Sequence, residues 1–199
     1  MDNWLWRFQI FIEQHSLALL LGMVLGLAGI PVLIFVHELG HALAVKLRGL
    51  PLRQLKVGGE SNFILVVGGF RMELGRLKGA GDVGGYVRYE SHRATPMDVL
   101  VIALAGPLAN LFGALLTGWL ALRYLHADPW IPVALLVLTW LGVVMVDGNL
   151  RPKGLTSDPT IWSDGLWVRV AWRQRHRRVP LWRDPNEATS IAPPVPTGG

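Results

Sequence analysis

The sequence predicts an α-helical polytopic membrane protein with three membrane-spanning segments and a small membrane-associated β element. Composition is the first reason, because hydrophobic residues make up 51% of the 199 residues and charged residues only 17%. Soluble domains carry about 25% charged residues. The second reason is that the apolar residues are concentrated in three long runs.

These three runs contain no charged residue. A helix needs about 20 apolar residues to cross the hydrocarbon core of a bilayer, and the runs match or approach that length. The first helix is expected to continue past its apolar run to Lys46 and to kink at Pro31. The runs cover residues 17–36, 99–122 and 129–146, and they predict spans at 17–47, 97–124 and 129–148 within a domain of residues 1–180.

Positive charge is distributed unevenly around the predicted spans. Only Arg7 and Arg123, of the 19 Lys and Arg residues, precede the first span or lie between the second and third. Because cytoplasmic loops are enriched in Lys and Arg, the N-terminus is expected outside and the C-terminus in the cytosol. With no recognisable targeting signal, this pattern suits an integral protein of a bacterial inner membrane. The net charge of +5 is then explained by topology and the lipid bilayer, and no nucleic-acid partner is expected.

The segment 50–93 is expected to form the small β element at the cytosolic membrane face. Residues 62–67 and 70–74 have strand character around a Gly68-Gly69 turn, and a second glycine pair precedes Tyr86-Val87. Such a sheet could shield a site, hold an extended substrate, or serve as a structural hairpin. Farther on, the basic run 172–178 is expected to contact anionic lipid, and the tail 181–199 is predicted to be disordered.

The sequence HELGH at 37–41 is the sharpest chemical signal. On a helix, His37 and His41 share one face, so both imidazoles can bind one Zn²⁺ with Glu38 beside a water that the zinc activates. Glu38 can then act as the general base. Ionisable groups within an apolar helix are costly and therefore rarely idle.

A catalytic zinc usually has a third protein ligand. The chain has no cysteine, so this ligand must be a carboxylate or another histidine. Acidic residues after the third span lie on the predicted cytosolic side, where His41 also lies. The candidates are Asp147, Asp158, Asp164, Glu60, Glu73 and the remaining histidines.

Four sequence elements in order give the chain a resemblance to a known family. They are HELGH at 37–41, GGYV at 84–87, AGPLAN at 105–110, and NLRP at 149–152 followed by SDG at 163–165. Together they resemble the site-2 protease family of intramembrane zinc metalloproteases. The resemblance covers residues 17–170 and implies a three-span metalloprotease core.

By that resemblance, His37, His41 and Asp164 are the zinc ligands and Glu38 is the general base. The stretch from the NLRP element to Asp164 is longer than is usual in the family. Asp158 falls nearer the usual spacing, but a proline follows it, whereas Asp164 is followed by the glycine of the motif. Asp164 is therefore favoured over Asp158.

The resemblance also gives roles to two amides. Asn110 and Asn149 are expected either to bind the substrate backbone or developing oxyanion, or to join helices by hydrogen bonds. Gly106 and Pro107 are expected to shape helix packing. A transmembrane protein or membrane peptide is the implied substrate. One alternative is a non-proteolytic regulatory member of the fold, against which the intact HExxH argues. A membrane di-iron enzyme would need more histidines than this chain has. A soluble zinc peptidase would not carry the three apolar runs.

Overall fold

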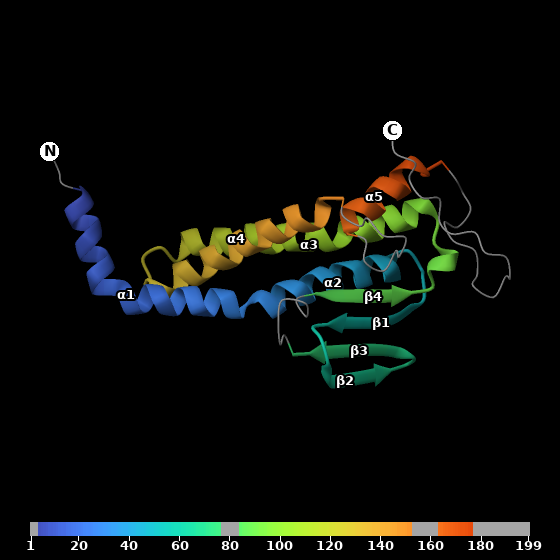
Figure 1. Ribbon diagram of the computed structural model, residues 1–199, viewed down its shortest axis with the longest axis horizontal. Helices are drawn as coiled ribbons and strands as arrows, with labels where there is room; N and C mark the ends of the chain where they lie inside the picture. The colour runs from blue at the N-terminus through green and yellow to red at the C-terminus, as the bar shows by residue number, and fades with distance from the viewer. Residues whose placement is uncertain (1–3, 77–83, 153–162, 177–199) are drawn as a thin grey trace.

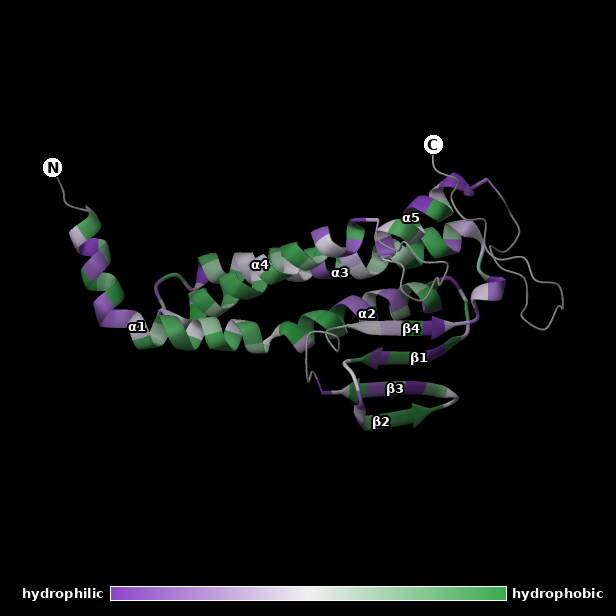
Figure 2. Ribbon diagram, in the orientation of Figure 1, coloured by the Kyte–Doolittle hydropathy of each residue, from purple (hydrophilic) through white to green (hydrophobic). Residues whose placement is uncertain are grey.

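The computed structural model describes residues 4–76, 84–152 and 163–176. Long helices lie side by side, and a four-stranded sheet lies along one of them (Figure 1). Three helical stretches are long and apolar enough to cross a membrane: Trp4–Leu47, Pro96–Arg123 and Trp130–Leu150. Their apolar character is visible along most of their length (Figure 2). The predicted helical class and the presence of a small sheet are confirmed.

The first stretch consists of α1 (Trp4–Ala28) and α2 (Ile30–Leu47), separated at Gly29. The break comes two residues before Pro31, so the expected kink is present, since proline cannot donate to the preceding turn. Helix α1 starts well before the predicted span at residue 17. Its first part lies at a steep angle to the rest (Figure 1), and it contains a Gln9–Glu13 side-chain hydrogen bond of 3.0 Å.

Helices α3 (Pro96–Arg123) and α4 (Trp130–Leu150) correspond to the second and third predicted spans. Helix α3 begins with a capping box, in which Thr95 and Asp98 satisfy each other's backbone N–H groups. The two helices pack against each other, and the Oγ1 atoms of Thr117 and Thr139 lie 2.9 Å apart between them. Such interhelical hydrogen bonds help join apolar helices in a bilayer.

The sheet contains β1 (Leu52–Val57), β2 (Ser61–Val67), β3 (Phe70–Gly75) and β4 (Gly85–Tyr89), in the order β2-β3-β1-β4. Strands β2 and β3 form the predicted antiparallel hairpin. Its turn uses Gly68 and Gly69, whose φ angles of 55° and 81° favour glycine. Strand β1, which pairs parallel to β3 and antiparallel to β4, was not predicted.

The sheet packs on α2 through its two strands nearest that helix, β1 and β4. Ile34 and Ala42 of α2 form a buried cluster with Leu55 and Val57 of β1. The strands run along the length of α2 (Figure 1), and β2 forms the far edge. Residues 63–67 of β2 are all apolar and all exposed. The edge of the sheet far from α2 is therefore an uncovered apolar strand.

A short helix, α5 (Asp164–Arg173), follows the spans and was not predicted. Its Ala171 is fully buried against Val99 and Leu100, near the start of α3. Its exposed face carries Arg169, Trp172 and Arg173. The predicted basic run extends beyond the described residues at 177–178, and the predicted disordered tail 181–199 lies outside them entirely.

Candidate metal centre

The HELGH residues lie on α2 where this helix meets α3. His37, Glu38 and His41 are all buried there. Gly40 permits the close approach, because a Cβ at this position would lie 2.6 Å from the carbonyl oxygen of Ala105. The small residues of the two helices thus bring α3 directly against the histidine face.

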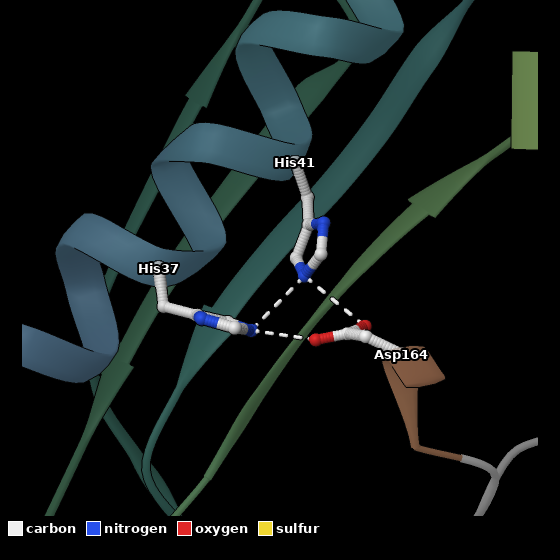
Figure 3. Close-up of side chains that lie close together, drawn as sticks. All are labelled: His37, His41 and Asp164. Carbon is white, nitrogen blue, oxygen red and sulfur yellow. Dashed lines mark hydrogen bonds and ion pairs between the residues drawn. The ribbon is translucent and has the colours of Figure 1, made fainter. Parts of the chain in front are cut away.

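The two imidazoles point toward the carboxylate of Asp164 at the start of α5 (Figure 3). The Nε2 atoms of His37 and His41 are 3.1 Å apart. The Oδ2 atom of Asp164 lies 3.0 Å from His37 Nε2, and its Oδ1 atom lies 3.4 Å from His41 Nε2. Residues far apart in sequence therefore place three potential metal donors in one triangle, which we call the donor group.

Helix capping positions Asp164. The hydroxyl of Ser163 accepts a hydrogen bond from the backbone N–H of Leu166 and donates one of 2.7 Å to the carbonyl oxygen of Arg151. The first bond caps α5, and the second ties the start of α5 to the end of α4. Gly165 is required beside them, because a Cβ there would collide with the backbone of Leu150. The Ser-Asp-Gly sequence thus fixes the carboxylate through its neighbours.

The charge state of Asp164 suits metal binding. Burial disfavours its ionised form, but hydrogen bonds from His37 and His41, with their charges, outweigh burial and lower the pKa of Asp164 to about 2. The carboxylate is therefore ionised at neutral pH. It offers a negatively charged ligand beside the two imidazoles.

The donor group fits a zinc ion in chemistry and in spacing. Two imidazoles and a carboxylate are a frequent catalytic zinc set, with bond lengths of about 2.0–2.1 Å. Tetrahedral bonds of that length place ligand atoms about 3.3 Å apart, close to the observed 3.0, 3.1 and 3.4 Å. Among residues 4–76, 84–152 and 163–176, this is the one group of three His or acidic side chains so arranged.

Gly106 of α3 leaves the space that such an ion needs. A Cβ on this residue would lie 2.8 Å from His37 Nε2 and 2.5 Å from His41 Cε1. Any side chain at this position would therefore enter the donor group. We expected Gly106 to shape helix packing, so its contact with the site was missed. The GPLAN motif was the available signal.

Glu38 lies between the donor group and the sheet. A Cβ on Gly85, the first residue of β4, would lie 2.6 Å from Cγ of Glu38. The GGYV element, which the sequence suggested was a turn and strand, thus allows β4 to pass directly against this carboxylate. No sequence motif indicated that Gly85 contacts Glu38.

The other predicted site residues are placed as follows. Asn110 is fully buried on α3, and its Nδ2 atom lies 3.2 Å from Nδ1 of His37. Asn149 lies half-buried in the last turn of α4, outside the donor group. Asp158 lies outside the described residues.

The remaining acidic candidates for the third ligand are engaged elsewhere. Asp147 pairs with Arg151 on the exposed side of α4 at 2.7 Å. Glu73 is buried in the sheet, where it pairs with Arg71 and accepts hydrogen bonds from Gln54 and Ser61. Neither residue is part of the donor group, and the same holds for Glu60, His15, His92 and His126.

A mostly helical chain with candidate spans and a His-His-Asp group, whose two histidines are buried, has the features of a membrane metalloprotease. A sequence model of peptidase family M50 matches residues 25–181. The chain therefore belongs to peptidase family M50, the site-2 protease family, as the four sequence elements predicted. A search of curated proteins found no match.

Proposed function

We propose that the protein is a zinc-dependent intramembrane endopeptidase that hydrolyses peptide bonds of membrane-anchored substrates from the cytosolic side. The observation that carries this proposal is the donor group of His37, His41 and Asp164, with Glu38 next to the first histidine. Two of these ligands and Glu38 are buried in a helix apolar enough to cross a membrane. Family membership supports the same chemistry.

The residues present can divide the work of hydrolysis between them. When bound, zinc supplies a Lewis acid that polarises the scissile carbonyl and acidifies a water molecule. Glu38 accepts a proton from the attacking water as the new C–O bond forms. It then delivers that proton to the amide nitrogen as the C–N bond breaks. Because Glu38 ends the cycle in its starting state, the reaction consumes one water per bond cut.

The position of His41 along α2 supports access from one side of the membrane. Lys46 lies five residues beyond His41, which is about 7–8 Å along a helix. Most of the positive charge lies on this side of the spans. A site at that depth is within the bilayer but close to cytosolic water.

The exposed face of α5 supports lipid contact at the same level. Arg169, Trp172 and Arg173 share one side of this helix and face away from α3. Cationic side chains and tryptophan suit an anionic headgroup layer. The helix that carries Asp164 would thus also anchor at the interface.

Substrate presentation is proposed to use β4. A transmembrane helix must unwind locally before water can attack, since its carbonyls are hydrogen-bonded within the helix. An unwound segment can bind as an added strand at a sheet edge. Strand β4 is an edge strand and touches Glu38 at Gly85, whereas the hairpin of residues 62–74 includes the far edge. The substrate strand is therefore assigned to β4.

Zinc content and cleavage, measured together in detergent, test the proposal. Wild type and Glu38→Gln should each hold one zinc, but only wild type should cleave a membrane-anchored model substrate. Asp164→Asn should bind zinc weakly, whereas Asp158→Asn should retain it. Loss of zinc in Asp158→Asn alone would move the third ligand to that residue. A folded wild-type protein without zinc would favour the non-proteolytic alternative.

A further inference from the structure

Asn110 makes a contact that the proposed reaction does not use. Its side chain is completely buried on α3, and its Nδ2 atom lies 3.2 Å from Nδ1 of His37 and 3.9 Å from Sδ of Met145. Its Oδ1 atom is buried without a hydrogen-bond partner among the described residues. The amide therefore meets the ring of His37 on the side opposite the Nε2 atom of the donor group.

Metal binding determines which ring nitrogen of His37 carries the proton. A neutral imidazole carries one N–H, and a nitrogen that binds metal must present its lone pair. If Nε2 of His37 binds zinc, Nδ1 carries the proton and becomes a donor. The atom facing Nδ1 must then be an acceptor, which the amide nitrogen of Asn110 is not.

The second histidine already satisfies the corresponding condition. Nδ1 of His41 lies 2.6 Å from the carbonyl oxygen of Ile102, which can only accept. A neutral His41 therefore carries its single proton on Nδ1, which leaves the lone pair of Nε2 available to a metal. Both histidines thus contact α3 through Nδ1, but only His41 faces an atom that fixes its tautomer for metal binding.

A half-turn of the Asn110 amide removes the conflict. The two ends of this group are nearly equal in size, so rotation exchanges Oδ1 and Nδ2 without displacing neighbours. In the present orientation Oδ1 has no hydrogen-bond partner to lose among the described residues, and the exchange gives up the 3.9 Å contact of Nδ2 with Sδ of Met145. A ligating imidazole strengthens as a donor and commonly bonds to a carboxylate or carbonyl oxygen through its other nitrogen.

We infer that Asn110 is a positioning residue for the metal ligand His37. In the zinc-bound protein, Oδ1 of Asn110 accepts a hydrogen bond from Nδ1–H of His37. This inference rests on the proposed zinc site. It replaces the expected role of Asn110 in binding the oxyanion, because the amide lies behind the ring and away from the donor group. The orientation with Nδ2 toward His37 corresponds to the other neutral tautomer, in which Nε2–H of His37 donates to Asp164.

The test compares two replacements of Asn110 with a control elsewhere on α3. Asn110→Leu removes the acceptor at similar size, and Asn110→Asp keeps an acceptor. Thr117→Val is the matched control, since it removes another interhelical hydrogen bond of α3 away from the donor group. Zinc affinity is measured by chelator competition, and thermal unfolding establishes that each variant is folded.

Asn110→Leu should weaken zinc binding by about 10–100-fold, the usual effect of losing such a partner. Asn110→Asp and Thr117→Val should stay within about threefold of wild type by the same reasoning. In zinc-bound wild type labelled with ¹⁵N-histidine, the ring proton of His37 should appear on Nδ1. The inference would be overturned if Asn110→Leu bound zinc with wild-type affinity, or if both Asn110 variants lost zinc affinity equally. A His37 ring proton on Nε2 would overturn it as well. Absence of zinc binding by wild type would instead refute the proposed function.

Discussion

Replacing Gly106 by alanine should strongly weaken zinc binding while leaving the fold intact. The added Cβ would lie 2.8 Å from Nε2 of His37 and 2.5 Å from Cε1 of His41. Ordinary contacts between such atoms are about 3.5 Å, so each ring would have to move by about 0.7–1 Å. Metal sites tolerate errors of about 0.2 Å in ligand position. We therefore expect zinc affinity to fall by at least about 100-fold, which is about 2.7 kcal/mol.

The effect on folding should be much smaller than the effect on metal. Overpacking costs about 1–3 kcal/mol, but alanine stabilises a helix over glycine by about 0.5–1 kcal/mol. Gly113→Ala is the matched control, because it lies on the same helix and its Cβ would meet nothing within 4 Å. This control should bind zinc normally and be slightly more stable.

The assay is zinc content by mass spectrometry, a chelator-competition titration and thermal unfolding, all in one detergent. A folded Gly106→Ala protein that binds one zinc with wild-type affinity would refute the reasoning. It would mean that the metal lies away from the face of His37 and His41 that Gly106 covers.

Three further predictions follow from the same structure. Gly85→Ala should retain zinc but cleave substrate at least about tenfold more slowly, because its Cβ displaces Glu38. The control Gly84→Ala, with nothing within 4 Å of its Cβ, should behave as wild type. Equal activity of the two variants would contradict the contact between Gly85 and Glu38. Thr117→Val should lower the free energy of unfolding by about 0.6–1.7 kcal/mol without changing zinc affinity; unchanged stability in denaturant titrations would show that this bond contributes nothing. Removing zinc held at 100 times its Kd should lower the free energy of unfolding by about 2.7 kcal/mol, and Asp164→Asn should lose most of this difference; an undiminished zinc effect in that variant would exclude Asp164 as a ligand.

The parts of the fold that could be predicted are those set by local sequence. The spans follow from apolar runs, and the β2–β3 hairpin follows from two strand-like segments around Gly68-Gly69. Strand β1 could not be found in this way. Its parallel partner β3 is reached only after the intervening strand β2, so no local turn marks the pairing. Helix α5 was missed because its basic residues indicated a lipid contact rather than a helix.

Among the site residues, too, those set by local sequence could be predicted and those set by the packing of separate elements could not. His37 and His41 are four residues apart, so helical spacing alone places them on one face. Asp164 lies 127 residues from His37, and only the resemblance to a family favoured it over other acidic residues. The structure brings the three together, and their role as ligands stays a prediction. The contacts of Gly106 and Gly85 depend on how separate elements pack, which a single sequence does not specify.

The uncovered strand β2 also affects how this protein can be handled. Outside a membrane, five consecutive apolar residues at a sheet edge, 63–67, form a template on which a second chain can add. Segments of this kind, without proline or charge, are typical starting points for aggregation. A detergent that covers only the helices would leave this template open, so monodispersity during purification should depend on a micelle wide enough to enclose the sheet edge as well.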